Sequence, residues 1–371
     1  MRIAVPTEIK NNEYRVAITP AGAHDLIAAG HEVTVQSGAG AGSSIPDSAY
    51  SDVGVTIVGD ADETWSTADL VLKVKEPIES EYRHFRSDLV LFTYLHLAAD
   101  KPLTSALADS GMTALAYETV ELPDRSLPLL APMSEVAGRL SAIVGANTLL
   151  KPAGGPGLLV PGVPGTHPAN ITVIGGGVAG TSAAHVALGL GAQVTVLDTN
   201  LSRLREIDAL YGGRIVTIAS NAVEIERSVV GADLVIGSVL VPGARAPKLV
   251  TNELVRKMRQ GSVLVDIAID QGGCFEDSHP TTHADPTFTV HDSVFYCVAN
   301  MPGAVPHTST YALTNATLPY IRSVATNGWK AAAARDQALA KGVNVHCGSI
   351  ANAGVAEAHG LRVTSLESLL S

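Results

Sequence analysis

Three glycines and one aspartate form the clearest chemical pattern in the chain. Gly175, Gly177 and Gly180 follow the strand-like run ITVI and open a helix-like segment, and Asp198 ends the next strand-like run, 18 positions after Gly180. In a βαβ unit the first glycine permits a tight turn, the second lets the backbone approach a pyrophosphate, and the third brings helix and strand together. Alone the glycine pattern is weak, but here strand, helix and acid stand in the required order, which predicts a dinucleotide site. Because a carboxylate accepts ribose hydroxyls and repels a 2′-phosphate, Asp198 favours NAD over NADP.

The ends of other strand-like runs supply further candidates for this site. In an open α/β sheet, ligands lie outside the carboxyl ends of the strands. Arg203 stands five positions after Asp198 and could serve an adenine ribose or a phosphate. Each remaining position could also belong to ordinary loop packing. The strand ends and the first two positions of the glycine-led helix nominate Val178, Ala179, Ser220, Val239, Leu240, Ile267, Ala268, Ile269, Asp270, Val298, Asn300 and Met301.

A second set of charged residues follows strand-like runs in the first third of the chain. Lys75 ends DLVLKVK and His96 ends DLVLFTYLH, so parallel strands would bring a fixed positive charge and a group titrating near neutrality to one crevice. Arg15, after the first strand, could add a bidentate clamp for a carboxylate. Asp270 is the carboxylate expected at the crevice mouth, whereas Asp266 would brace the turn. Singly, each has an ordinary structural explanation; together, at equivalent strand ends, they favour a catalytic site.

Other catalytic patterns are missing from the sequence. Without an HExxH spacing no metal site is expected, and neither a GxSxG elbow nor a P-loop is present. Cys297, inside FYCV, is interpreted as a small buried hydrophobe. The three cysteines have no CxxC spacing, which argues against a disulfide framework or a zinc ribbon and suits a reducing cytoplasm.

Composition limits the classes of protein that need to be considered. The 371 residues are 46% hydrophobic and 16% charged, with 35 glycines, a profile typical of parallel α/β sheets rather than of disorder. A formal charge of −11 with no basic patch argues against nucleic acid and acidic membrane surfaces as partners. The uncharged stretch 152–197 could be mistaken for a membrane span, but glycines at 175–180 interrupt it, so no membrane segment is expected.

Short β-type runs alternate with helix-like segments, which indicates right-handed crossovers and mostly parallel sheets. A long helix is expected over 133–150 and another helical run from 307. We therefore predict an α/β protein with two doubly wound, Rossmann-like domains joined by an interdomain helix. Residues 1–128 and 306–371 would form the substrate and catalytic domain, and residues 129–305, with the interdomain helix, the NAD-binding domain. The strand-like runs of the first domain are 2–5, 31–36, 56–58, 69–75, 88–96 and 113–120.

Several long, ungapped segments resemble the bacterial alanine dehydrogenases of the alanine dehydrogenase and pyridine nucleotide transhydrogenase family. They cover about residues 1–320, and the tail after Tyr320 carries little of the resemblance. The resemblance implies oxidative deamination of L-alanine with NAD to pyruvate and ammonia, and the reverse amination. Besides the glycine motif, the segments are PTEIKNNEYRVAITPAGAHDL, VLKVKEP, LFTYLHLA, LPLLAPMSEVAGRLS, LVPGARAPKLV, VLVDIAIDQGGCFE and YCVANMPGAVPHTSTYALTNATLPY.

The same resemblance implies roles for residues in the matching motifs. Arg15 and Lys75 would hold the substrate carboxylate and carbonyl. His96 would be the acid/base, and Asp270 would be its partner carboxylate, holding the imidazole or relaying its proton. Ser134, at the start of the interdomain helix, would contact the cofactor. The resemblance also implies a homohexamer in which C-terminal helices complete the first domain.

Three other interpretations of these residues stay open. The soluble NAD-binding component of a transhydrogenase would share the fold but would not need Arg15, Lys75 and His96 together. A catalytically idle NAD sensor would lack one or more of those side chains. A related amino-acid dehydrogenase of the saccharopine-like group would differ in the walls of its substrate crevice.

Overall fold

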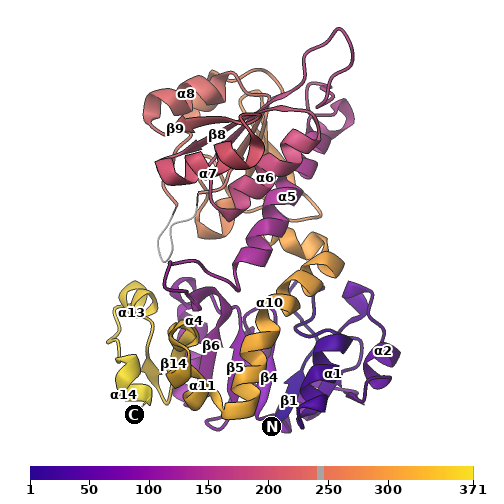
Figure 1. Ribbon diagram of the computed structural model, residues 1–371, viewed down its shortest axis with the longest axis vertical. Helices are drawn as coiled ribbons and strands as arrows, with labels where there is room; N and C mark the ends of the chain where they lie inside the picture. Colours follow the sequence, from indigo (N-terminus) through magenta and orange to yellow (C-terminus); the bar gives the residue numbers. More distant parts are fainter. Residues whose placement is uncertain (240–245, 371) are drawn as a thin grey trace. The chain divides into compact units, whose positions relative to one another are not determined.

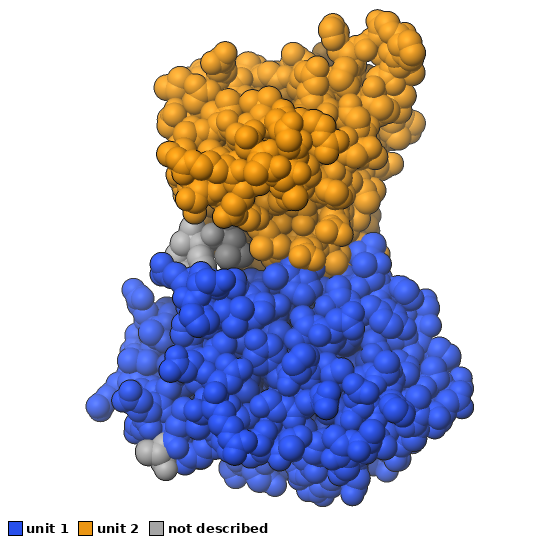
Figure 2. Space-filling model, viewed as in Figure 1, with its two compact units in different colours: residues 1–133, 305–371 blue, residues 134–304 orange. Residues whose placement is uncertain are grey.

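The computed structural model describes residues 1–239 and 246–370, and the chain forms two compact units. Unit 1 combines Met1–Met133 with Val305–Ser371, and unit 2 is the continuous segment Ser134–Ala304 (Figure 2). Each unit is built around its own sheet, so the two are described separately below.

Two helices stand where the chain passes from one unit to the other. Helix α5 (Ala131–Thr148) contains the first passage and matches the helix expected over 133–150. Helix α10 (Pro306–Asn327) begins just after the second passage and matches the expected helical run from 307. Neither these nor the other helices in the described part of the chain are long and apolar enough to cross a membrane.

An eight-stranded sheet forms the centre of unit 1, in the order β15-β14-β6-β5-β4-β1-β2-β3. Strands β14, β6, β5, β4 and β1 are labelled in Figure 1. Strands β1 to β6 run parallel in the doubly wound order, with the winding direction reversing between β1 and β4. At such a reversal the loops after the two strands diverge and leave room for a ligand at the carboxyl edge. The parallel strands are β1 (Arg2–Val5), β2 (Glu32–Gln36), β3 (Thr56–Val58), β4 (Leu70–Leu72), β5 (Val90–Thr93) and β6 (Thr113–Ala116).

Apolar runs and helix caps explain these elements locally. Every residue of β4, β5 and β6 is buried, as expected of parallel strands covered by helices on both faces. Before α1 (Pro20–Ala28), the Thr19 hydroxyl accepts a hydrogen bond from the Gly22 amide, and Pro20 occupies the first helical position. The other helices of unit 1 are α2 (Asp47–Ser51), α3 (Ala61–Ser66), α4 (Lys101–Ser110), α11 (Trp329–Arg335), α12 (Gln337–Gly342), α13 (Ala353–His359) and α14 (Leu366–Leu370).

The C-terminal segment adds two strands that the sequence did not predict. Strand β14 (Val343–His346) pairs antiparallel with β6 (Figure 1). Strand β15 (Ser349–Ile350) pairs antiparallel with β14. Runs of four and two residues are too short to show a readable alternation. They cover the edge of β6, so the tail after Tyr320 belongs to the same sheet as the N-terminal strands.

A seven-stranded sheet in the order β12-β13-β11-β10-β7-β8-β9 forms the centre of unit 2. Its six parallel strands follow the dinucleotide-binding order, with the reversal between β7 and β10, which confirms the predicted Rossmann-like α/β class. Apolar cores lie on both faces of the sheet. The elements are β7 (Asn170–Ile174), α6 (Val178–Gly189), β8 (Gln193–Asp198), α7 (Leu201–Tyr211), β9 (Val216–Ala219), α8 (Ala222–Val230), β10 (Leu234–Gly237), α9 (Asn252–Arg256), β11 (Val263–Asp266), the antiparallel β12 (Thr287–Val290) and β13 (Ser293–Tyr296).

Three strands of unit 1 end earlier than the apolar runs predicted. Strand β4 ends at Leu72 rather than at Lys75, because the amide of Val74 donates to the carboxylate of Glu8 instead of a strand neighbour. Strand β5 ends at Thr93 rather than at His96, which has a left-handed backbone. Strand β6 ends before a short 3₁₀ turn over Tyr117–Thr119. The residues after these strands are therefore loop residues at the carboxyl edge of the sheet.

Candidate active site

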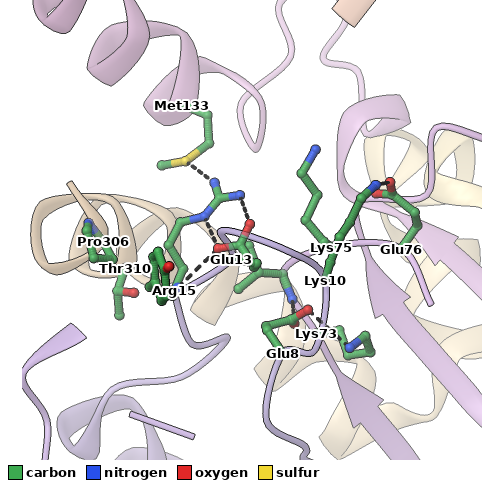
Figure 3. A network of polar contacts seen from close by, with 12 residues as sticks. Glu8, Lys10, Glu13, Arg15, Lys73, Lys75, Glu76, Met133, Pro306 and Thr310 are labelled. Carbon is green, nitrogen blue, oxygen red and sulfur yellow. Dashed lines mark hydrogen bonds and ion pairs between the residues drawn. The ribbon is translucent and has the colours of Figure 1, made fainter. Parts of the chain in front are cut away.

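A buried charge network joins the loop after β1 to the segment after β4. The ammonium of Lys73, 1% exposed, lies 3.1 Å from the Glu8 carboxylate (Figure 3). It also lies 2.8 Å from the carboxylate of Glu81. Burial opposes the charge on Lys73, but the two carboxylates outweigh it and raise the pKa of this lysine above its usual value. For Glu8, by contrast, burial is the larger effect and raises the pKa, against the attraction of Lys73. The network ties together the two loops that diverge at the reversal point of the sheet.

Arg15 lies buried in the loop after β1, beside Glu13. Its Nε donates to Glu13 Oε1 at 2.7 Å and its Nη2 to Glu13 Oε2 at 2.5 Å, a bidentate pair (Figure 3). Its Nη1 lies 3.0 Å from the sulfur of Met133. The Glu13 carboxylate thus binds one edge of the Arg15 guanidinium and fixes the arginine side chain in one position.

Lys75 and Glu76 follow β4 at the same edge of the sheet. Lys75 is half-buried, whereas Glu76 is buried and pairs with the ammonium of Lys10 from the loop after β1 (Figure 3). Burial disfavours the Glu76 carboxylate, but the hydrogen bond to His96 and the charge of Lys75 hold its pKa far below the usual range. Glu76 is therefore an ionised acceptor near neutral pH.

His96 occupies the turn after β5, with its side chain 38% exposed. Its Nδ1 lies 3.2 Å from Glu76 Oε2, and its backbone amide donates to Glu118 Oε1 at 2.6 Å. The ring of Tyr94 lies 6.0 Å from the imidazole, centroid to centroid. An imidazole hydrogen-bonded to a buried carboxylate is an arrangement that suits general acid/base chemistry.

The glycine turn of unit 2 has the geometry that a pyrophosphate needs. Gly175 has φ +101°, in the region that favours glycine, and a Cβ on Gly180 would lie only 1.8 Å from the Gly175 carbonyl oxygen. A Cβ on Gly177 would meet no atom within 4 Å, so open space lies there. Gly177 is the N-cap residue of α6, and no side chain there accepts hydrogen bonds from the amides of the first helical turn. An anion can bind to such amides at the start of a helix. These residues fit a dinucleotide.

Asp198 and Arg203 both hold the glycine turn. Asp198 Oδ2 accepts from the Gly176 amide at 2.6 Å, and Oδ1 accepts from the amide two residues further on, at 2.7 Å. Because a carboxylate can accept about four hydrogen bonds, capacity for ribose hydroxyls remains. Arg203 Nε donates to the Gly176 carbonyl at 2.6 Å, and its Nη1 pairs with Glu206 at 2.7 Å.

The other nominated residues of unit 2 lie at the carboxyl edge of its sheet, except that Leu240 lies outside the described residues. Some of these side chains are buried in the core and could offer only backbone atoms: Ala268, Ile269, Val298 and Met301. The nominated positions are Val178 and Ala179 at the start of α6, Ser220 after β9, Val239 after β10, Ile267–Asp270 after β11, and Val298, Asn300 and Met301 after β13. Ser134 lies half-buried in the first turn of α5.

Asp266 and Asp270 have different surroundings at the end of β11. Asp266 is fully buried and accepts hydrogen bonds from the amides of Ala268, Cys274 and Phe275 and from a serine hydroxyl. It therefore braces the turn, as its position predicted. Asp270, at the exposed end of the same turn, is available to solvent. Within the described residues, no group of three or more His, Cys, Asp or Glu is placed to hold a metal ion.

Sequence reasoning missed the carboxylates that hold the nominated cations and imidazole. Glu13 and Glu76 are sequence neighbours of nominated residues, and Glu118 follows β6 in the same way that His96 follows β5. The strand-end rule, applied to every charged residue after β4, β5 and β6, would have found Glu76 and Glu118. Glu13 has no comparable signal, because it lies within an irregular loop.

The two doubly wound sheets, the glycine turn and the charged strand ends define a two-unit protein of the Rossmann-like class. Family models give the narrower assignment: the N-terminal domain of alanine dehydrogenase/PNT matches residues 4–137, and the C-terminal domain matches residues 141–353. The chain belongs to the alanine dehydrogenase/PNT family.

Individual relatives agree with this assignment. The alanine dehydrogenase of Mycolicibacterium smegmatis is 61% identical over 357 residues, or 96% of each chain. A solved structure of an L-alanine dehydrogenase matches with a TM-score of 0.94 at 50% identity, covering 97% of this chain and 99% of the other. A transhydrogenase from Sinorhizobium meliloti is more distant, with a TM-score of 0.82 and 26% identity over 95% of this chain and 99% of its own.

Proposed function

We propose that the chain catalyses the NAD-dependent oxidative deamination of L-alanine to pyruvate and ammonia, and the reverse reductive amination. The observation that carries this proposal is the similarity of the chain to proteins named alanine dehydrogenase. One of them is 61% identical over 96% of this chain. The likeness to a transhydrogenase, at 26% identity, is much weaker. Arg15, Lys75 and His96 are all present, which argues against an idle sensor.

Unit 2 would bind NAD through the glycine turn and the neighbouring strand ends. The pyrophosphate would lie against the amides that open α6, and Asp198 would accept hydrogen bonds from the adenine ribose. Arg203 supports NAD over NADP, because its guanidinium already has Glu206 and the Gly176 carbonyl as partners. Ser134 and the residues after β9, β10, β11 and β13 would complete the contacts. When bound, NAD accepts the hydride that leaves the alanine Cα.

Unit 1 would position the amino acid. Arg15 and Lys75 would bind the substrate carboxylate and, in the reverse direction, the carbonyl of pyruvate. Glu13 holds Arg15 in place, so little side-chain freedom would be lost on binding. A substrate held at two charged points is fixed in orientation, which turns an encounter between two molecules into a positioned reaction.

His96 would move the protons of the hydrolytic steps. Once alanine has lost hydride, water adds to the resulting imine of pyruvate, and neutral His96 takes a proton from that water. The imidazolium then returns a proton to the departing ammonia, and Asp270 would relay protons. Overall, L-alanine, NAD⁺ and water give pyruvate, ammonium, NADH and one proton.

The proposal extends to domains, assembly and location. Residues 1–128 and 306–371 would carry substrate and catalysis, and residues 129–305 would bind NAD. A cytoplasmic homohexamer without nucleic-acid or membrane partners is proposed. The net charge of −11 supports the lack of nucleic-acid and acidic membrane partners, and the free thiols of Cys274, Cys297 and Cys347 suit a reducing cytoplasm. The hexamer is what the family resemblance implies. The mass of the purified protein, measured by light scattering after gel filtration, tests the hexamer.

The activity is tested by following NADH absorbance with purified protein, NAD and a panel of amino acids at alkaline pH, where the amine is free. We expect a signal that depends on L-alanine and is absent with NADP. Turnover of a larger amino acid instead would favour a related amino-acid dehydrogenase. NADH binding without turnover of any amino acid would favour the transhydrogenase component or the sensor.

A further inference from the structure

His96 lies between two carboxylates that come from the strands on either side of its own. Strands β4, β5 and β6 are neighbours in the sheet, and they are followed by Glu76, His96 and Glu118 respectively. Glu76 is bonded to the imidazole, and Glu118 to the backbone of the histidine. Both the ring and the main chain of the proposed acid/base are therefore held by charged partners within unit 1.

Glu118 holds the backbone of His96 in a left-handed conformation. His96 has φ 51° and ψ 33°, in the left-handed region that is unfavourable for residues with a side chain. The Glu118 carboxylate accepts hydrogen bonds from the amide of His96 at 2.6 Å and from the amide of Leu95 at 3.1 Å. Two charge-assisted bonds offset the strain and fix the direction in which the imidazole leaves the chain.

Glu76 determines which imidazole nitrogen carries the hydrogen. Glu76 is buried, and Lys10 pairs with Oε1 while Nδ1 of His96 lies 3.2 Å from Oε2. The carboxylate is ionised near neutral pH, because its pKa is held far below the usual range. An ionised carboxylate only accepts hydrogen bonds, so the hydrogen lies on Nδ1 of neutral His96 and the lone pair on Nε2.

We propose that Glu76 is the positioning residue of His96: it selects the tautomer whose Nε2 accepts a proton, with Lys10 holding the carboxylate and Glu118 the backbone. This inference rests on the proposed function, in which His96 is the acid/base. The family resemblance implies two alternative roles for Asp270: it holds the imidazole or relays its proton. Our inference assigns the orientation of the imidazole to Glu76, and proton relay stays the role proposed for Asp270.

Several charged or titratable groups lie around the His96 segment within unit 1. The negative groups are balanced by two lysines, so removal of one carboxylate leaves a net positive surrounding. The groups are Lys10, Lys75, Glu76, Tyr94, Glu118 and His359.

The decisive variant is Glu76→Gln, which keeps the shape of the side chain but removes its charge. We expect kcat with L-alanine to fall roughly 10- to 1000-fold, less than for loss of His96 itself, with KM for alanine and NAD within about threefold. We also expect the acidic limb of the pH profile to move to lower pH, because imidazolium loses its carboxylate. Glu76→Asp should recover part of kcat. Glu79→Gln is the matched control, since Glu79 is an exposed acid three positions away.

A second measurement does not depend on turnover. Diethyl pyrocarbonate reacts with imidazole only in its neutral form, and peptide mass spectrometry separates labelling at His96 from labelling at other nucleophiles. In the Glu76→Gln protein the pH midpoint of labelling should fall, whereas the Glu79→Gln protein should match the parent. Should Glu76→Gln not fold, Lys10→Met, at an exposed ammonium, is expected to lower kcat about two- to tenfold and to raise the labelling midpoint slightly, because a positive charge is removed.

These measurements separate the inference from the proposed function. Activity of the parent protein on alanine, together with unchanged kcat and unchanged His96 labelling in the Glu76→Gln protein, would overturn the positioning role alone. Lack of activity in the parent protein would overturn the proposed function, and the labelling shift would still decide whether Glu76 controls the imidazole. A fall in kcat without any change in the pH profile or labelling would also contradict the inference, since a purely structural role explains it.

Discussion

Replacement of Gly180 by alanine is expected to destabilise unit 2. The added Cβ would lie 1.8 Å from the Gly175 carbonyl oxygen and 2.6 Å from the Ser238 hydroxyl, where about 3.5 Å is a normal separation. The clash is with backbone, so the glycine turn or α6 must shift. Overpacking of this kind costs about 1 to 3 kcal/mol, and a contact this close belongs at the upper end. For a unit of this size we expect the melting temperature to fall by roughly 5 to 10 °C.

Replacement of Gly177 by alanine should leave the stability of unit 2 almost unchanged and weaken the binding of NADH. The backbone there has φ −65° and ψ −166°, which any residue can adopt, and the new methyl group would meet no atom within 4 Å. Stability should therefore stay within about 0.5 kcal/mol of the parent. The methyl group would instead occupy the space proposed for the pyrophosphate. We expect NADH affinity to fall roughly 10- to 100-fold, or about 1.4 to 2.8 kcal/mol.

The two variants are compared by thermal melting without cofactor and by titration of NADH fluorescence. Gly189→Ala is the matched control, because Gly189 ends the same helix and a Cβ there meets nothing within 4 Å. It should leave binding unchanged and stabilise the helix by up to about 1 kcal/mol. The reasoning fails if the Gly180 variant melts like the parent, or if the Gly177 variant binds NADH with parental affinity.

Further expectations concern the charged residues. His96→Gln should lower kcat about 100- to 10,000-fold while NADH affinity stays within about threefold; near-parental turnover would remove His96 from the chemistry. Asp198→Ala should reduce the preference for NAD over NADP, measured as a ratio of kcat/KM values, by about tenfold or more, and an unchanged ratio would show that this carboxylate does not meet the ribose. Lys73→Met should destabilise the protein by about 3 to 5 kcal/mol in urea, because it leaves two buried carboxylates facing each other; parental stability would contradict the buried network. The pKa of Glu76 is lowered on folding, so its contribution to stability is present above the unfolded pKa near 4.5 and is lost as the pH falls below it. Urea unfolding between about pH 6 and pH 3 should therefore be less pH-dependent for Glu76→Gln than for the parent, and parallel curves would refute the assignment.

Local patterns in the sequence were sufficient for much of the fold. The glycine spacing, the strand before it and the acid after it predicted the β7-α6-β8 unit, and the structure has all three elements. Thr19 and Pro20 marked the start of α1. These signals are reliable because each depends on residues close together in the chain: a turn that needs glycine, a helix start that needs an acceptor, or a strand that needs continuous apolar side chains.

The sequence overestimated the strands that lead into the unit 1 site. Alternating residues continue past Leu72 and apolar residues past Thr93, so the pattern alone extends the strands to Lys75 and His96. The strands end earlier because distant groups compete for the backbone. The Val74 amide bonds to Glu8, which lies 66 positions away, and carboxylate bonds stabilise the left-handed turn at His96.

By itself, therefore, the sequence determined the class of fold, the doubly wound pattern, the nucleotide-type turn and the strand ends at which chemistry is expected. Only the tertiary structure decided which charges meet: Lys73 with Glu8, and His96 with Glu76 and Glu118. It also decided that β14 closes the edge of β6. The reason is physical: ion pairs form between side chains that the order of strands brings together, and that order is a property of packed sheets rather than of neighbouring residues.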